Sequence, residues 1–133
     1  MSKFRIIVAG GREFDDYELL SISIGSYLEK IKVEQGADEN LDIEFVSGGA
    51  RGADRLGEKF SYYNGYKFKR FPADWSKHKK AAGPIRNREM AEYASKEHGI
   101  LFAFWDGSSK GTKSMIELGN QYGLEVHVIY YEG

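Results

Sequence analysis

The sequence predicts a doubly wound α/β fold, in which a parallel five-stranded sheet of order 3-2-1-4-5 carries helices on both faces. Short apolar segments alternate with amphipathic ones, and this alternation builds a parallel sheet because crossover connections are nearly always right-handed. The first and fourth apolar segments are the most continuous, which is typical of central strands. The third and fifth alternate between apolar and polar residues, as edge strands do.

Composition limits the class of protein. With 133 residues the chain is long enough to bury an apolar core without disulfides, and we expect one domain over residues 1–133. It has no cysteine and only three, widely spaced histidines, so we expect no metal site and no cofactor. No apolar run approaches the roughly 20 residues that span a bilayer, and the N-terminus leads directly into a strand instead of a signal peptide. We therefore expect a cytoplasmic protein with no membrane contact.

The first half of the sequence predicts a strand, a helix, a second strand and a second helix. The expected elements are a strand at 3–9, a helix from 15 or 16 to about 33, a polar loop at 35–40, a strand at 42–47 and a helix from about 53 to 64. Asp15 or Asp16 can cap the first helix, whose apolar residues then recur at steps of three and four. Glycines follow both strands directly.

The second half continues the alternation. The expected elements are an edge strand at 66–71, a loop without periodicity at 72–83, a helix from 84 to about 96, a central strand at 99–105, a glycine and hydroxyl loop at 106–112, a helix ending at 123 and a strand at 124–131. Pro84 suits the first turn of a helix. A loop as long as 72–83 in a small domain is usually functional or mobile.

Three glycine-containing loops are expected to meet at one edge of the sheet. In the order 3-2-1-4-5 the chain reverses between strands 1 and 4, and ligands bind at the carboxyl ends of the strands beside that point. Each loop opens a helix, whose free N–H groups favour an anion, so we predict a phosphate-bearing ligand. The predicted ligand-binding residues of these loops are Gly10, Gly11 and Arg12; Ser47, Gly48, Gly49, Arg51, Gly52 and Asp54; and Ser108, Ser109, Lys110, Gly111 and Thr112. None of the loops is a Walker A or GxGxxG sequence.

Several of these residues have a second interpretation. Arg12 can reach a phosphate or pair with a neighbouring acid, and Lys110 can reach a phosphate or remain in solvent. Asp54 can contact the ligand, or it can charge and cap the start of its helix.

The basic stretch between Lys67 and Arg88 contains eight basic residues and one acid, Asp74, and is either a local anion-binding face or a solvated loop. Within it, Trp75 offers an aromatic face that can stack on a base. Asp74 can then bond an exocyclic amine or a ribose hydroxyl. The alternative is that Trp75 packs this loop onto the sheet.

Five segments, VAGGREFDD, VSGGARGAD, FPADW, AAGPIRNREMA and AFWDGSSKGT, resemble in this order the SLOG superfamily. The likeness is strongest to its small stand-alone branch related to YspA and YpsA, and the segments span nearly the whole chain. The resemblance implies a Rossmann-like fold that binds a nucleotide or nucleotide derivative. The superfamily includes the cytokinin-activating LOG phosphoribohydrolases and the DNA-processing DprA proteins. Some members of the small branch are associated with phages, prophages and conflict systems, so a phage or prophage link is also implied.

The resemblance adds a helix-start arginine to the candidate site. In LOG enzymes an arginine in an ERKxxM helix start and a glutamate in PGGxGTxxE serve phosphoribosyl binding and glycosidic cleavage. Arg86, four residues before Met90, matches that arginine, and Gly111 and Thr112 match the GT pair. In DprA-like proteins an RNR sequence occurs at a comparable helix, and residues 86–88 reproduce it, which adds Asn87 to the ligand-binding residues.

The catalytic glutamate of LOG enzymes has no counterpart at the matching position. Met115 stands there, and the nearest acid is Glu117. A hydrolase would therefore use Arg86 with Asp106 or Glu117, where the acid stabilises an oxocarbenium charge or activates water.

We therefore expect a sensor or sequestering module that binds a nucleotide or nucleotide-derived molecule. The first alternative is an N-glycoside hydrolase acting on a nucleotide. The second is a nucleic-acid-binding accessory protein, which a net charge of −1 makes the weaker choice. Family likeness also leads us to expect a homo-oligomer.

Overall fold

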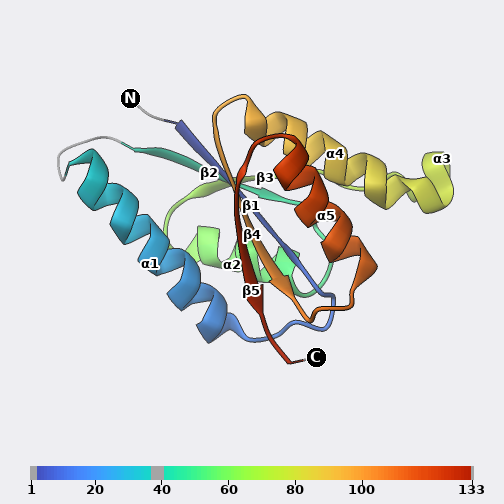
Figure 1. Ribbon diagram of the computed structural model, residues 1–133, viewed down its shortest axis with the longest axis horizontal. Helices are drawn as coiled ribbons and strands as arrows, with labels where there is room; N and C mark the ends of the chain where they lie inside the picture. Colours follow the sequence, from blue (N-terminus) through green and yellow to red (C-terminus); the bar gives the residue numbers. More distant parts are fainter. Residues whose placement is uncertain (1–2, 37–40, 133) are drawn as a thin grey trace.

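The computed structural model describes residues 3–36 and 41–132, which form a parallel sheet with helices on both faces (Figure 1). The strand order is β3-β2-β1-β4-β5, and every neighbouring pair is parallel. The strands are β1 (Lys3–Gly10), β2 (Asp42–Ser47), β3 (Lys67–Arg70), β4 (His98–Trp105) and β5 (Glu125–Tyr130). The predicted fold class and strand order are confirmed.

Four of the described helices begin and end close to the predicted positions, namely α1 (Tyr17–Gln35), α2 (Ala53–Tyr63), α4 (Ala82–Ser95) and α5 (Lys110–Gln121). The structure also has a short helix, α3 (Trp75–His78), and a 3-10 turn at Lys79–Ala81. The expected polar loop at 35–40 is only partly covered, because residues 37–40 lie outside the described residues. No helix of the described part is long and apolar enough to cross a membrane.

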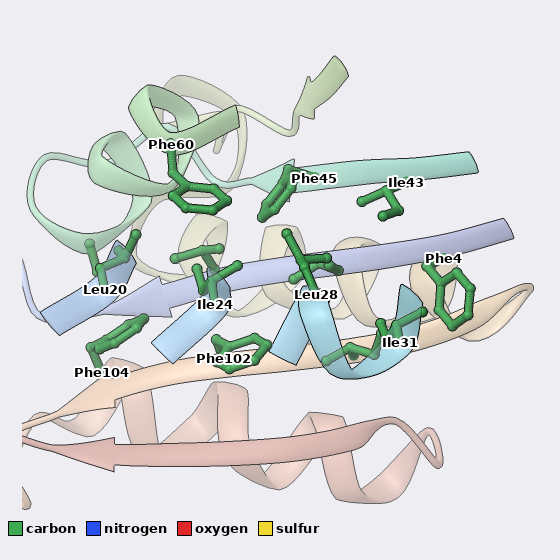
Figure 2. Close-up of a cluster of buried hydrophobic side chains, with 14 of the residues drawn as sticks. Phe4, Leu20, Ile24, Leu28, Ile31, Ile43, Phe45, Phe60, Phe102 and Phe104 are labelled. Carbon is green, nitrogen blue, oxygen red and sulfur yellow. The ribbon is translucent and has the colours of Figure 1, made fainter. Parts of the chain in front are cut away.

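The two sheet faces are covered by different helices. Alternate residues of the central strands, such as Phe4, Ile6 and Val8 of β1, pack with α1 and α2 in one cluster (Figure 2). The intervening residues, such as Ile7 and Ala9, pack with α4 and α5 in the other. Both faces of β1 and β4 are therefore buried, which accounts for their continuous apolar sequence.

Helix α1 shows how local sequence sets an element. Asp16 is the N-cap, and its side chain accepts a hydrogen bond from the Leu19 amide at 3.0 Å. The apolar residues that follow at helical spacing are the buried ones, Leu20, Ile24, Leu28 and Ile31. The helix ends at Gln35, two residues beyond the predicted end.

The stretch 72–83, expected to be a loop, contains helix α3 and the 3-10 turn, so that expectation was wrong. Asp74 caps α3 by accepting hydrogen bonds from the Lys77 amide at 3.1 Å and the Ser76 hydroxyl at 2.8 Å. A four-residue helix is too short to show a hydrophobic period, so only this capping residue marks it in the sequence. In Figure 1, α3 projects from the body of the molecule at the N-terminal end of α4.

Candidate functional site

A pocket of about 610 Å³ opens at the carboxyl ends of β1 and β4, where the strand order reverses. The loop after β1 is fixed against β4, because the Gly11 amide donates to the Phe104 carbonyl at 3.3 Å. The predicted site residues that line this pocket are Gly10, Gly11, Arg12, Asp54, Trp75, Arg86, Asn87, Asp106, Ser109, Lys110, Gly111 and Thr112.

The start of α5 forms one wall of the pocket. The amides of its first residues, Lys110, Gly111 and Thr112, have no acceptor within the helix, and the N-cap Ser109 forms no side-chain capping bond. Its hydroxyl lies instead 3.3 Å from that of Thr112. The Trp105 indole donates to the Ser109 carbonyl at 2.9 Å, which fixes the helix start. This wall therefore presents free N–H groups and two hydroxyls to the pocket.

Arg86 reaches the pocket from α4 and connects it to the loop after β2. Its Nη1 donates to the Gly48 carbonyl at 2.6 Å, and its Nε donates to Asn87 Oδ1 at 2.9 Å. Burial lowers the pKa of the guanidinium, and the neighbouring Asp54 opposes this shift. Arg86 is thus a positive charge held in place before any ligand is bound.

Asp54 lies in the pocket wall with only 6% of its surface exposed. Burial raises its pKa to about 6, against the opposing effects of Arg86 and of a hydrogen bond from the Ala50 amide. That bond, at 3.2 Å, closes the loop after β2, whereas the N-cap of α2 is Gly52. Asp54 therefore does not cap its helix.

Arg12 and Lys110 are the exposed cations of the pocket. Neither has an ion pair or a side-chain hydrogen bond with another described residue. The neighbouring Glu13 pairs instead with Arg51, whose Nη2 lies 2.5 Å from the Glu13 carboxylate. Both cations are available to a ligand.

The loop after β2 divides between the pocket and a second hollow. Ala50 lines both pockets, Asp54 at the start of α2 lines the first, and Gly48, Gly49 and Arg51 line a second one of about 440 Å³. Ser47 lines neither, because its buried hydroxyl donates to Glu58 at 2.6 Å and accepts from the Gly49 amide at 2.9 Å. Gly52 also lines neither.

Trp75 stands between the two pockets and lines both. Its side chain is 51% exposed, so it does not pack the stretch 72–83 onto the sheet. Asp74, by contrast, lines neither pocket, and its carboxylate is occupied by capping α3. Of the basic residues in the stretch between Lys67 and Arg88, only Arg70 and Arg86 line either of these two pockets.

The candidate catalytic acids differ in position. Asp106 lines the first pocket, but its Oδ1 accepts hydrogen bonds from the Ser108 and Ser109 amides at 2.9 and 2.8 Å. These bonds lower its pKa, so it is a carboxylate that does not readily carry a proton. Glu117 is exposed on α5 and lines neither pocket, and neither does Ser108.

Some lining residues were not predicted. Tyr131 and Ser114 line the first pocket, and Arg55 and Arg70 line the second. Tyr131 follows the last strand at the carboxyl edge of the sheet, and this position is a signal that could have identified it. Arg55 offers no such signal, because its side chain leaves an exposed helix position to reach the Gly49 carbonyl at 2.8 Å.

The strand order and the pocket beside its switch point define a Rossmann-like α/β protein with a cation-lined pocket at the carboxyl edge of the sheet. The family model for YspA, cpYpsA-related SLOG proteins matches residues 4–78. The chain belongs to this SLOG family. The matched span contains the loops after β1 and β2 and ends before Arg86 and α5.

Two known proteins are similar to the chain over most of its length. The Gene 61 protein of Mycobacterium phage D29 is 26% identical over 129 residues, which cover 92% of this chain and 93% of that protein. The crystal structure of a predicted subunit of tRNA methyltransferase from Methanocaldococcus jannaschii aligns with a TM-score of 0.44 and 17% identity, over 100% of this chain and 71% of the other.

Proposed function

We propose that the protein binds a nucleotide or nucleotide-derived, phosphate-bearing molecule in the first pocket, as a sensor or sequestering module. The observation that carries this proposal is the meeting of Arg12, Arg86 and Lys110 with the uncapped start of α5 around one hollow. Backbone N–H groups at a helix start and arginine side chains are the usual partners of phosphate. Membership of the SLOG family supports the same class of ligand.

The shape and lining of the pocket support a ligand larger than an inorganic ion. Its volume of about 610 Å³ falls in the range of small-molecule sites. Beside the cations, the side chains of Met90, Met115 and Tyr131 provide an apolar and aromatic wall. Phosphate would contact α5 and the arginines, while the base or ribose lies against this wall or against Trp75.

Thermal denaturation with a panel of nucleotides, including AMP and ADP-ribose, tests the proposal. A ligand that binds only the folded state raises the melting temperature in proportion to its occupancy. We expect Arg86→Ala to abolish the rise. Arg88→Ala is the matched control, because Arg88 lies on the same helix, is exposed and lines neither pocket.

Arg86 also supports the loop after β2, so Arg86→Ala can lower the melting temperature without ligand. Arg12→Ala provides a second variant, because Arg12 is exposed and has no side-chain hydrogen bond with another described residue. It should fold normally and weaken binding about tenfold, the value of one charge-assisted hydrogen bond. A panel without any shift in the wild type contradicts the proposal.

N-glycoside hydrolysis is the second candidate function, and Asp54 is the observation that favours it. This reaction breaks the C–N bond between ribose and base, with water supplying a hydroxyl to C1′ and a proton to the base. Asp54 is a buried carboxyl in the pocket with a pKa raised to about 6, and such a group can hold a proton near neutral pH. Asp54 is therefore proposed as the general acid that protonates the leaving base, which differs from the oxocarbenium-stabilising or water-activating role that the sequence offered to Asp106 or Glu117.

Chromatography of nucleotides incubated with the protein separates binding from turnover. Hydrolysis predicts a free base whose release Asp54→Asn abolishes while binding is retained. If no base is released at saturating nucleotide, the protein is a binder without this activity.

A further inference from the structure

We propose that the second pocket is a second anion subsite of the same ligand site, which selects a nucleotide with two phosphate groups separated by a ribose. This proposal rests on the proposed function of the first pocket and names the substrate class more closely. Five of the residues that line the second pocket are arginines, namely Arg12, Arg51, Arg55, Arg70 and Arg86. Among the residues that the structure describes, no acid lines it.

Hydrogen bonds hold three of the five arginines of this pocket in place. Arg55 Nε donates to the Gly49 carbonyl at 2.8 Å, and Arg86 Nη1 donates to the Gly48 carbonyl at 2.6 Å. Arg70 Nε donates to Glu58 at 2.9 Å, and its Nη2 bonds the other oxygen of the same carboxylate. A guanidinium has five N–H donors, so each of these groups keeps donors for a further partner.

The local charge remains positive after the nearby acids are counted. Glu58 accepts from Arg70, and Glu13 pairs with Arg51. The remaining acid in contact with the group is Asp54, on the side of the first pocket. Three carboxylates thus face five guanidinium groups, and the acids lie behind or beside the arginines instead of in the hollow. An anion entering the pocket meets donors without a competing carboxylate.

The two pockets share a boundary that one molecule can cross. Arg12, Ala50, Trp75 and Arg86 line both. Arg12 and Arg86 can therefore contact an anion on either side, and the half-exposed ring of Trp75 can pack against the ribose between the two phosphates. A nucleoside that carries phosphates at two ends has this arrangement. A mononucleotide would fill only the first pocket.

Calorimetric titration with AMP, ADP and adenosine 3′,5′-bisphosphate tests this assignment. These probes carry one phosphate, two adjacent phosphates and two phosphates separated by the ribose. The wild type should bind the bisphosphate at least about tenfold more tightly than AMP, because a further charge-assisted contact is formed. The affinity for ADP should be closer to the affinity for AMP than to that for the bisphosphate.

The variants remove two of the five arginines of the second subsite and none of the cations that line the first pocket. The double variant Arg51→Ala, Arg55→Ala should bring the bisphosphate to the affinity of AMP and change the AMP affinity less than about twofold, because neither residue lines the first pocket. The matched control is Lys59→Ala, which removes an exposed charge from α2 outside both pockets. Circular dichroism melting of each variant checks that the fold is retained.

The outcomes separate this proposal from the one on which it rests. If AMP binds the wild type and the bisphosphate binds no more tightly, the second subsite is disproved while the first pocket stands. If none of the three probes binds, both proposals fail for adenine nucleotides. If a ten-residue single-stranded oligonucleotide binds more than tenfold more tightly than the bisphosphate, with the same loss in the double variant, the occupant is a nucleic acid strand and the small-molecule assignment is overturned.

Discussion

The loops after β2 and β4 have similar glycine-rich sequences but different surroundings. In SGGARG, the space beside each glycine is already filled. A Cβ on Gly48 would lie 2.5 Å from Arg86 Nη1, and a Cβ on Gly49 would lie 2.7 Å from Arg70 Cδ. The amides of Gly49 and Ala50 donate to Ser47 and Asp54 within the loop. These glycines let other chain segments approach closely.

In DGSSKGT, by contrast, the space beside the glycines is open. Neither Gly107 nor Gly111 has an atom within 4 Å of an added Cβ. The first amides of α5 face the pocket without a capping side chain. A glycine loop at a helix start therefore serves packing when neighbours fill the space beside its glycines, and it can serve a ligand when that space is open. We therefore assign the phosphate contact to α5 and the arginines.

The largest expected difference between the two loops is the loss of folding stability when a glycine is replaced by alanine. Gly52 has φ +85°, and a Cβ there would overlap the backbone of Gly11 and Arg12, so Gly52→Ala should destabilise the protein by about 3 kcal/mol or more. Gly111→Ala meets open space in the first turn of a helix and should change stability by at most about 1 kcal/mol, on the stabilising side. Urea denaturation measures both. Equal losses would mean that the two loops are packed alike.

The second effect is the pH dependence of stability, which should have opposite sign for Asp54, at the helix start after β2, and for Asp106, in the loop after β4. Burial raises the pKa of Asp54 to about 6, so the folded state keeps a proton that the unfolded state loses. Stability is therefore lost as pH rises from about 4 to 6. Asp54→Asn avoids this loss and should be more stable than wild type at pH 8, by on the order of 2 kcal/mol, with little difference at pH 4.

Asp106→Asn is the matched comparison in the loop after β4. Hydrogen bonds from the Ser108 and Ser109 amides lower the pKa of Asp106, so its carboxylate contributes stability above its ordinary pKa, which is lost as pH falls. This variant should be less stable than wild type at neutral pH, and the difference should shrink in acid. Urea denaturation at pH 8 and pH 4 measures both variants. If both variants were more stable than wild type at pH 8, or both less stable, the assignment of a buried Asp54 and a hydrogen-bonded Asp106 would be contradicted.

The smallest effect concerns ligand affinity at the start of α5. Lys110→Ala removes an exposed cation that lines the pocket and should weaken AMP binding about threefold, as expected for a solvent-screened charge contact. Lys113→Ala is the control, because Lys113 is exposed on the same helix and does not line the pocket. Calorimetric titration should give the control variant the same AMP affinity as the wild type. Equal effects of the two variants would indicate long-range attraction instead of contact.

The fold was predictable because it depends on patterns that repeat along the chain. The continuous apolar sequence of the central strands and the alternation in the edge strands were enough to give the strand order, which the structure confirms. The convergence of the loops after β1 and β4 follows from that order. Helix α3 was not predictable from periodicity, since four residues do not complete a repeat.

The division of the site into two pockets was also not predictable. It depends on Arg86 filling the space beside Gly48, a contact between residues 38 positions apart in the chain. The second pocket depends on Arg55 and Arg70 being held by the Gly49 carbonyl and by Glu58. Spacing along the sequence does not encode such long-range side-chain contacts. Arg55 was therefore not predicted at all, and Arg70 was predicted only as one member of the basic stretch between Lys67 and Arg88.

The most direct measurement of the proposed binding mode is a titration of the ¹⁵N-labelled protein with AMP, followed by amide chemical shifts. We predict the largest shifts at Lys110, Gly111 and Thr112, whose amides face the first pocket at the start of α5. The amides of Gly49 and Ala50 should shift little, because both are bonded within their own loop. The largest shifts at Gly49 and Ala50, with none at the start of α5, would contradict the assignment of the phosphate to α5.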